Sequence, residues 1–379
     1  MKLLDIPKNT EEKVEYAKQL IYITNKNIRD GIEVRIGDID FSKAGDCVAR
    51  EGSIEGEAIK RAIITLRGNG CEWAREQNGG CTMCGHLSGS SRGTKISEEK
   101  IKKQFDDSME SFDFSRHPML CLYNGGSFLN ENEISKELRQ YMFKRISEVT
   151  DIKTLIIESR PIHVTDEVLD EIERLLPNIV VEVGIGLESS NDIVRNVILN
   201  KGTELEEYEK VSAKFKHRKI KLLMYVLIKA PFLTEREAID DAIATIEFAH
   251  KIGVDNISLE PVSIQEETFI DYLSKLGHYR APWIWTVFEI IKKTYHLGLL
   301  MRIGGFQFFP IPKQYTSNCP DCDEEMILKI KEFNETNDIK VIEGLKCKSG
   351  CDKKWMEEVQ KIDNKDILDR VISLIEAYC

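Results

Sequence analysis

The sequence lacks any apolar run long enough to cross a membrane. Its longest apolar stretches, such as residues 222–228, fall far short of the roughly 20 residues that a membrane helix needs. Residues 1–13 hold no apolar core, so we expect no signal peptide. We therefore expect a cytoplasmic protein with no membrane partner, in which clustered cysteines bind metals more often than they form disulfides.

The sequence also lacks an excess of positive charge. It has 53 Lys and Arg residues against 64 Asp and Glu residues, a net charge of −11. A protein whose main task is to grip nucleic acid is usually basic. Any contact with nucleic acid has to come from local basic segments, such as residues 214–221 or the lysine-rich C-terminal third, although most such runs are only solvated surface.

What the chain does contain is a repeated alternation of short apolar runs and amphipathic stretches. The apolar runs are rich in Ile, Val and Leu, as in buried strands of a parallel sheet: residues 62–66, 119–123, 154–159, 179–188, 221–229 and 256–260. Helical patterns with capping residues lie between them, for example at 97–112, 165–176 and 234–253. Six βα units predict an α/β protein, either a partial (β/α)6 barrel or an open doubly wound sheet.

Three cysteines follow the first predicted strand. Cys71, Cys81 and Cys84 have the spacing C-x9-C-x2-C within a glycine-rich loop. Loops after the strands of an α/β barrel carry its chemistry. Three thiolates can bind three irons of a 4Fe-4S cluster and leave the fourth iron free. The alternative is a zinc site with His86 as a fourth ligand.

Small and acidic residues stand at the ends of the next three predicted strands. A small-residue turn of Asn124, Gly125, Gly126 and Ser127 follows the second strand, and it can expose backbone to a ligand. Glu158 and Glu188 end the third and fourth strands, where a carboxylate can accept hydrogen bonds from hydroxyl or ammonium groups. Each is weak evidence alone, and their recurrence at successive strand ends makes them a candidate site.

Together these motifs resemble the radical S-adenosylmethionine (SAM) enzymes. Residues 158–161 and 186–202 are similar to the branch with the Elongator catalytic subunit and the oxygen-independent coproporphyrinogen oxidases, although the first cysteine gap is longer than the usual C-x3-C-x2-C. Residues 199–202, 228–243, 259–273 and 279–287 resemble the archaeal radical SAM enzymes of archaeosine biosynthesis. This resemblance covers residues 20 to 310 approximately.

The resemblance implies a lyase that uses a 4Fe-4S cluster and SAM. A 5′-deoxyadenosyl radical would break the carbon–nitrogen bond of a lysine adduct on 7-cyano-7-deazaguanine in tRNA and leave archaeosine. The implied partners are this tRNA, the synthase that adds lysine, and a reductant such as ferredoxin. The alternatives are radical chemistry on another tRNA base or on a tetrapyrrole, and a non-catalytic scaffold that binds zinc at both cysteine sets.

The resemblance also assigns site residues. The cluster ligands would be Cys71, Cys81 and Cys84. The SAM contacts would be Asn124, Gly125, Gly126, Ser127, Glu158, Arg160, Glu188 and Ser189, with Arg195 as a carboxylate clamp. The residues that meet the modified base would be Tyr225, Lys229 and Glu260. For each of these, ordinary packing or an ion pair is the competing interpretation.

Four more cysteines stand in two close pairs near the C-terminus. Cys319 and Cys322 are followed 24 residues later by Cys347 and Cys351, a pattern typical of a tetrahedral structural zinc site. A second iron–sulfur cluster is the main alternative. We expect an N-terminal helical extension at 1–60, the barrel at 61–300 and a small C-terminal zinc domain at 301–379, with a helix and then a strand between the cysteine pairs.

Overall fold

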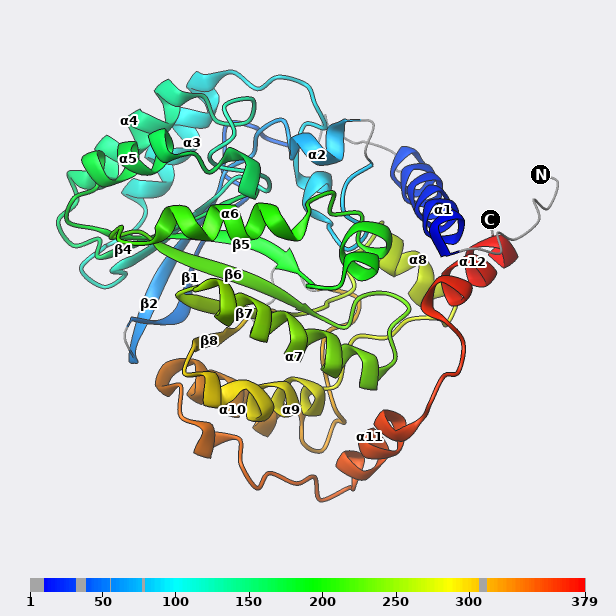
Figure 1. Cartoon of the computed structure of the whole chain (residues 1–379). Helices are drawn as coiled ribbons and strands as arrows, with labels where there is room; N and C mark the ends of the chain where they lie inside the picture. Colours follow the sequence, from blue (N-terminus) through cyan, green and yellow to red (C-terminus); the bar gives the residue numbers. More distant parts are fainter. Residues whose placement is uncertain (1–9, 32–38, 55, 77–78, 307–311, 379) are drawn as a thin grey trace.

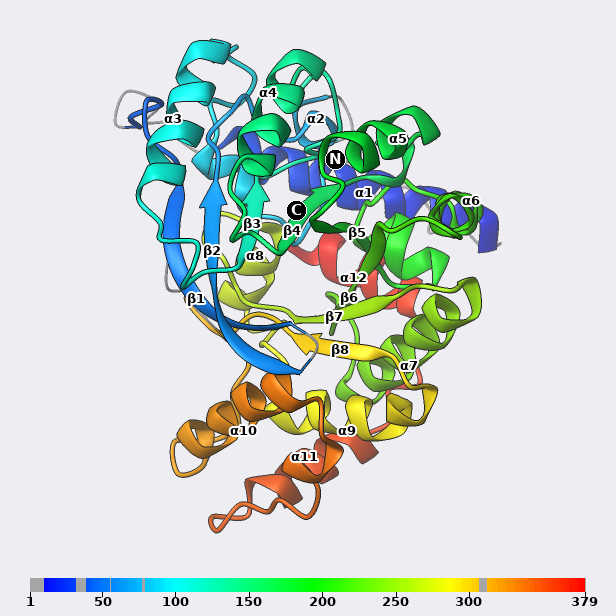
Figure 2. The same cartoon turned by 90° about the vertical axis from the view of Figure 1, so that its left-hand side faces the viewer.

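The computed structural model describes residues 10–31, 39–54, 56–76, 79–306 and 312–378. Its centre is one eight-stranded sheet, which curls around an interior that we call the lumen (Figures 1 and 2). The first two strands are antiparallel, and all later neighbours are parallel. The strands are β1 Asp46–Ile54, β2 Glu57–Thr65, β3 Met119–Tyr123, β4 Thr154–Ser159, β5 Val180–Glu188, β6 Lys221–Ile228, β7 Asn256–Pro261 and β8 Leu300–Ile303.

The strand order decides between the two predicted architectures. A doubly wound sheet reverses its strand order at a switch point. Here the order runs from β1 to β8 without reversal, as in a barrel. The six predicted strands are β2 to β7, and the partial barrel is confirmed.

Helices cover the outer face of this sheet, as Figure 2 shows for α3, α4, α5, α6, α7 and α9. Side chains of these helices and of the strands form one apolar core, in which Ile157, Val183 and Leu222 are fully buried. The helices are α1 Thr10–Asp30, α2 Glu72–Arg75, α3 Glu98–Glu110, α4 Lys136–Ser147, α5 Asp166–Leu175, α6 Leu205–Phe215, α7 Glu235–Ile252, α8 Phe269–Lys275, α9 Ile284–Thr294, α10 Asp323–Thr336, α11 Cys351–Gln360 and α12 Ile367–Tyr378. None of the described helices is long and apolar enough to pass through a membrane.

The longest barrel helix, α7, has the ends that its sequence predicts. Thr234 caps its N-terminus in a capping box with Glu237, and Gly253 ends it in the left-handed conformation. Thr165 caps α5 with a single side-chain hydrogen bond, accepted from the backbone N of Val168. Ser97 stands at the N-cap position of α3, as its sequence predicts, but its side chain makes no capping hydrogen bond.

Two strands and one connection differ from the prediction. Within the range 1–60, expected to be a helical extension, residues 46–54 form β1, an edge strand whose alternating exposure reflects one face toward solvent. The sequence also hid β8, because its four residues form no recognisable run. The predicted strand between the cysteine pairs is a short 3-10 turn, Ile339–Val341, which follows the left-handed Asn337 at the end of α10.

The C-terminal segment covers the edge of the sheet. Asn334 of α10 accepts a hydrogen bond from the backbone N of Ile303 at 2.7 Å and donates one to its carbonyl at 2.9 Å. The backbone carbonyl of the same residue accepts a hydrogen bond from Ser53 of β1 at 2.8 Å. Helix α10 therefore satisfies the exposed backbone of β8 and joins it to β1.

Candidate functional site

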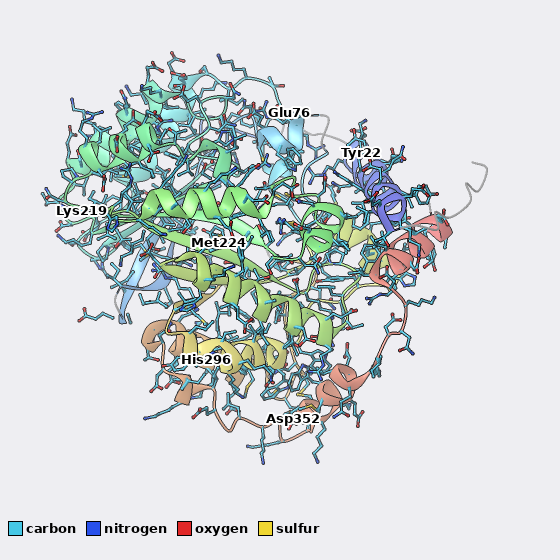
Figure 3. The ribbon with its side chains drawn as sticks, in the orientation of Figure 1. Tyr22, Glu76, Lys219, Met224, His296 and Asp352 are labelled. Carbon is cyan, nitrogen blue, oxygen red and sulfur yellow. The ribbon has the colours of Figure 1, made fainter. Side chains whose placement is uncertain are left out.

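The loop after β2 places its three cysteines at the carboxyl end of the parallel strands, and helix α1 holds the loop there. Arg29 of α1 donates from Nη2 to the carbonyls of Cys81 and Cys84 at 2.7 and 3.3 Å. Asn25 donates to two glycine carbonyls just before Cys81, at 2.9 and 3.0 Å. Figure 3 labels Tyr22 of α1 and Glu76 of this loop. The sequence carried no signal that α1 would contribute to this site.

The partly buried thiols of this loop are suited to binding a metal. Burial, with smaller contributions from Glu133 and the other two cysteines, raises the pKa of Cys71 to about 12. Burial also raises the pKa of Cys84. A bound cation favours the thiolate, and this offsets the cost of ionising a buried thiol.

These three cysteines do not form a compact single-ion site with His86. Across the described part of the chain, the only group of ligand atoms within 4.8 Å of one another is the C-terminal four-cysteine group. A cluster of several irons spreads its thiolates more widely than one zinc ion does. The set of three thiols without a fourth therefore fits a 4Fe-4S cluster better than zinc.

A buried carboxylate, Glu133, ties the loop after β3 to the cysteine loop. Its Oε2 accepts hydrogen bonds from the backbone N of Ser127 at 2.7 Å and from Asn124 Nδ2 at 3.0 Å. Its Oε1 accepts from the backbone N of Glu72, next to Cys71, at 2.9 Å. Sequence reasoning missed Glu133, since nothing distinguishes it from other loop acids before the fold is known.

The small-residue turn leaves room for this contact and an open acceptor beside it. A Cβ atom on Gly126 would clash with the Glu133 carboxylate and would lie 3.0 Å from the Cα of Cys71. The Oδ1 atom of Asn124 is buried and has no hydrogen-bond partner in the described structure. An unsatisfied buried acceptor fits a ligand that donates there, such as the ammonium group of SAM.

Arg160 links the end of β4 to the loop after β5. Its Nη2 donates at 3.1 Å to the carbonyls of Lys201 and Gly202 and to Thr203 Oγ1. Its guanidinium lies 4.4 Å from the ring centre of Trp73 in the cysteine loop. Arg160 thus fixes the position of neighbouring loops, and its buried Nε is left without a partner in the described structure.

Two predicted SAM contacts are placed away from the lumen. Ser189 is fully buried, and its hydroxyl donates to Asp241 in α7 at 2.6 Å. Arg195 is also fully buried, donates to the carbonyls of Thr203 and Ser189, and pairs with Asp192. Arg195 shares Thr203 with Arg160 and so supports the same loop, while the polar groups of both Ser189 and Arg195 are satisfied by the protein itself.

The lumen is lined by one half-exposed position on each of five consecutive strands. From β3 to β7, the last few positions of each strand are buried apart from a single residue: Tyr123, Glu158, Gly186, Tyr225 and Glu260. Side chains inside a curled sheet can be reached by solvent only if the interior is open. The carboxyl end of the lumen is therefore lined by partly exposed groups beneath the cysteine loop, and an apolar cluster of Met119, Cys121, Ile156 and Leu223 packs next to them.

Two of the three residues predicted to meet the substrate share this lumen. The hydroxyl of Tyr225 donates to Glu158 Oε1 at 2.9 Å. Glu260 accepts a hydrogen bond from Ser258 at 2.6 Å. Burial, with Glu188 and Glu158 nearby, raises the pKa of Glu260 to about 7.

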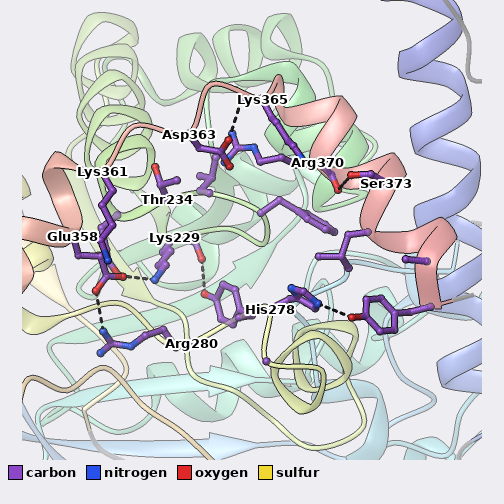
Figure 4. A pocket seen from close by; sticks show the side chains of 18 residues that line it. Lys229, Thr234, His278, Arg280, Glu358, Lys361, Asp363, Lys365, Arg370 and Ser373 are labelled. Carbon is purple, nitrogen blue, oxygen red and sulfur yellow. Dashed lines mark hydrogen bonds and ion pairs between the residues drawn. The ribbon is translucent and has the colours of Figure 1, made fainter.

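The third, Lys229, points away from the lumen. Its Nζ donates to Glu235 at the start of α7 at 2.5 Å, and its side chain is only 6% exposed. It lines a separate cavity of about 910 Å³ between the start of α7, the loop after α8 and the segment around α12 (Figure 4). Strand alternation predicts the same face for residues 225 and 229, which are four positions apart. Lys229, however, follows the last residue of β6 and has a positive φ of 68°, so the alternation does not continue to it.

The four C-terminal cysteines converge on one point. The Sγ atoms of Cys319 and Cys322, Cys319 and Cys347, and Cys322 and Cys351 are 3.6, 3.5 and 3.6 Å apart. A tetrahedron with zinc–sulfur distances of about 2.3 Å has edges of about 3.8 Å. Trp285 of α9 donates to Cys351 Sγ at 3.2 Å, so the group is anchored to the barrel. The predicted four-cysteine site is confirmed as a cluster of thiols that could hold one ion.

The chain resembles archaeal proteins along most of its length, although no protein-family profile matches it. It is 32% identical over 320 residues to an uncharacterized protein of Methanocaldococcus jannaschii, covering 82% of this chain and 84% of that one. It is 26% identical over 307 residues to the archaeosine synthase subunit beta of Methanosarcina acetivorans, covering 81% and 87%. It is 29% identical over 308 residues to the archaeosine synthase subunit beta of Thermococcus kodakarensis, covering 80% and 93%.

Solved structures overlap with this fold more loosely. Methylornithine synthase has a TM-score of 0.46 at 10% identity, covering 98% of this chain and 89% of that one. Elp3 of Methanocaldococcus infernus has a TM-score of 0.45 at 15% identity, covering 64% and 59%. At these values the overlaps say nothing about the chemistry of this site.

Proposed function

The chain belongs to the radical SAM family that includes the beta subunits of archaeosine synthase, and from this premise we propose that it is an enzyme of tRNA modification. The reaction that we propose is cleavage of the carbon–nitrogen bond of a lysine adduct on 7-cyano-7-deazaguanine in tRNA, which would leave archaeosine. The observation that carries this proposal is the three-cysteine loop held over the partly exposed polar groups of the lumen in a chain related to those subunits.

The proposed cofactors are a 4Fe-4S cluster on Cys71, Cys81 and Cys84 and a SAM molecule at the turn after β3. When bound, they supply a 5′-deoxyadenosyl radical that takes a hydrogen atom from the substrate. The fit is supported by three partly buried thiols without a fourth and by the unsatisfied acceptor of Asn124 in the neighbouring turn.

The protein's own residues position these groups and shield them from water. Glu133 connects the SAM turn to the cysteine loop, so that both keep one relative geometry. Arg160 and Trp73 pack the next loop against the same cysteine loop. We propose that Glu158, Glu188 and Tyr225 line the space in which SAM and the substrate meet.

The C-terminal four-cysteine group is proposed to hold a structural zinc ion rather than a second cluster. The spacing of its sulfur atoms, 3.5 to 3.6 Å in the three recorded pairs, supports a single ion. We propose residues 301–379 as a small zinc-binding unit after the barrel of residues 61–300, with residues 1–60 adding α1 and β1 in front.

The proposed macromolecular partners are tRNA and the lysine-adding synthase, with ferredoxin or a similar protein as the reductant. The word "subunit" in the names of two relatives supports a complex. Four exposed lysines near the zinc group offer contacts for the tRNA backbone: Lys346, Lys348, Lys353 and Lys354.

The test is a reaction of the anaerobically reconstituted protein with SAM, dithionite and tRNA that carries the lysine adduct. Mass spectrometry would quantify the nucleosides and 5′-deoxyadenosine. We expect archaeosine and 5′-deoxyadenosine in equal amounts. Formation of 5′-deoxyadenosine without archaeosine, in protein verified to hold its cluster, would leave the radical chemistry and overturn the substrate.

A further inference from the structure

The charged groups of the lumen are not all matched with one another. Glu188 pairs with Lys201 at 2.8 Å. Glu182 pairs with Arg302 at 2.5 Å. Among the described residues, no ion pair within 4.0 Å is recorded for the remaining anion of β7, Glu260, whose hydrogen-bond donor is the neutral hydroxyl of Ser258.

One cation of the lumen is likewise unmatched. Arg61 of β2 has no recorded ion pair among the described residues, and its Nε atom is buried without a hydrogen-bond partner. Arg61 lies close enough to Glu260 to oppose the rise in the pKa of that carboxyl, yet no ion pair joins them, and the guanidinium contacts the thiol of Cys121 instead. Glu158 also makes no recorded ion pair and accepts a hydrogen bond from the neutral hydroxyl of Tyr225. Among the described residues, the lumen therefore holds two carboxylates and one guanidinium outside ion pairs.

Two glycines leave room for the polar ends of the Glu260 and Tyr225 side chains at the wall of the lumen. A Cβ atom on Gly304, just after β8, would clash with the Glu260 carboxylate. A Cβ atom on Gly184 of β5 would lie 2.7 Å from the hydroxyl of Tyr225. Because glycines stand beside the Glu260 carboxylate and the Tyr225 hydroxyl, these groups can lie directly against the backbone, and both side chains remain partly exposed.

The two unmatched groups stand at different depths. Arg61 pairs in register with Met119, the first residue of β3, and so lies toward the amino end of the strands. Glu260 is the penultimate residue of β7, nearer the edge that carries the cysteine loop. Lys201 pairs with Glu188 and also lies within electrostatic reach of Cys81. The end of the lumen near Glu188 therefore adjoins the cysteine loop.

We propose that the lumen binds the zwitterionic amino-acid end of the substrate's lysine adduct, with Glu260 accepting a hydrogen bond from its α-ammonium group and Arg61 donating hydrogen bonds to its α-carboxylate. This inference rests on the proposed function and names the group by which this site recognises its substrate. A zwitterion supplies a cation for one unpaired carboxylate and an anion for the unpaired guanidinium. Glu260 is the carboxylate that we assign, because Arg61 lies within electrostatic reach of it and the two charges of the ligand stand on one carbon atom. Charge-assisted hydrogen bonds in such a partly enclosed site are about twice as strong as neutral ones.

Small fragments of the adduct test the proposal directly. Binding of Nε-acetyl-L-lysine to the cluster-loaded, SAM-bound protein would be measured anaerobically by calorimetry and by ligand-observed NMR. Nα,Nε-diacetyl-L-lysine lacks the ammonium group, and Nε-acetyl-L-lysine amide lacks the carboxylate. We expect each change to weaken binding about tenfold or more, as loss of a charged hydrogen bond does.

Variants then show which residue recognises the ammonium group and which recognises the carboxylate. Glu260→Gln should abolish the preference for the free ammonium group while keeping the preference for the carboxylate, and Arg61→Gln should do the reverse. Glu247→Gln and Arg116→Gln, at exposed positions outside the lumen, serve as matched controls and should keep both preferences. No saturable binding of Nε-acetyl-L-lysine, or equal binding of all three fragments, would overturn the proposal.

The same variants separate this inference from the proposed function. If the wild-type protein forms archaeosine and both lumen variants keep its KM for the tRNA adduct, the inference fails and the function stands. If no archaeosine forms but the fragments bind with the expected discrimination, the amino-acid site stands and the proposed reaction fails.

Discussion

At the scale of single residues, the site depends on buried carboxylates whose partners come from distant parts of the chain. Glu133 receives two backbone N–H groups from loops that are separated by more than fifty residues. Glu260 and Glu158 stand on different strands but share the lumen with Tyr225. Their roles differ because their surroundings differ, although all three are glutamates at the ends of elements or in loops.

Glu133→Gln should loosen the cysteine loop. The amide would turn an N–H₂ group toward at least one N–H donor that the carboxylate now satisfies, and a buried donor without an acceptor costs about 1–3 kcal/mol. We expect a corresponding loss in the free energy of unfolding and less iron bound after reconstitution. Denaturant unfolding and iron analysis would measure both.

The control is Glu131→Gln in the same loop. That side chain is 61% exposed and makes only a 3.7 Å pair with Arg139. Equal iron content in both variants would contradict the role that we assign to Glu133.

Glu260 should give the protein a pH-dependent stability. Its pKa is raised from 4.5 to about 7 in the folded protein, mainly by burial, with Glu188 and Glu158 adding to the shift and Ser258 and Arg61 opposing it. Between these values the folded state binds a proton that the unfolded chain has released. The free energy of unfolding therefore falls as the pH rises from about 4.5 to about 7.

The measurement is urea unfolding of the wild-type protein and of Glu260→Gln across that range. In the wild-type protein, the free energy of unfolding should fall by up to about 3 kcal/mol across this range, and by less to the extent that solvent screens this partly exposed group. The variant should not show this fall. If both proteins showed the same pH dependence, the carboxyl would have to be ionised as in a free glutamate.

At the scale of elements, helix α10 closes an edge that a short strand leaves open. β8 has four residues, and its outer backbone groups are satisfied by Asn334 and by Asn337, whose Nδ2 donates to the carbonyl of Met301 at 2.6 Å. The C-terminal segment is thus part of the barrel's edge as well as the carrier of the four cysteines.

Asn334→Ala should destabilise the whole barrel. It removes two hydrogen bonds to Ile303 and leaves a backbone N–H and a carbonyl without partners, at a cost of about 2–3 kcal/mol. Thermal unfolding would show a lower Tm. Glu332→Ala on the exposed face of the same helix removes only a surface pair with Lys329 and should change the Tm little. An equal drop in both variants would contradict the role that we assign to the edge contact, because alanine favours a helix more than either residue that it replaces.

Cys351→Ser should release the metal of the four-cysteine group. A tetrahedral zinc site needs all four ligands, and Cys351 also receives the hydrogen bond from Trp285. We expect the loss of one zinc equivalent by elemental analysis, with the iron content unchanged. Cys47→Ser, at an exposed cysteine of β1, is the control. Loss of iron in place of zinc would show that this group holds a cluster.

At the scale of the whole molecule, an acidic chain has to present a local basic surface if it is to bind tRNA. The exposed lysines around the four-cysteine group, Lys346, Lys348, Lys353 and Lys354, lie on α11 and the turn before it, apart from α6 in Figure 1. Each contact between a lysine and a phosphate releases counterions. Removing these lysines should therefore weaken tRNA binding and make its salt dependence less steep.

Replacing these four lysines with glutamine should lower tRNA affinity steeply, by tenfold or more at low salt if each contacts a phosphate. Filter binding across a salt series would measure both affinity and slope. Lys136→Gln together with Lys144→Gln, at exposed positions of α4 outside both basic segments, should change neither. An unchanged slope in the fourfold variant would place the tRNA on another face.

The sequence alone determined the parts that depend on local pattern. Largely apolar runs predict β2 to β7, since strands covered on both faces are rich in Ile, Val and Leu, and a capping box with a glycine stop predicts both ends of α7. The spacing of the cysteines along the chain distinguished the three of the loop after β2 from the four near the C-terminus. Tertiary structure decided everything that joins distant segments: α1 holds the cysteine loop through Arg29, Glu133 joins two loops, and the curl of the sheet directs Glu260 into the lumen while Lys229 faces outward. Those contacts depend on which strands become neighbours and on how the side chains then fill the space between them, and no local pattern encodes either.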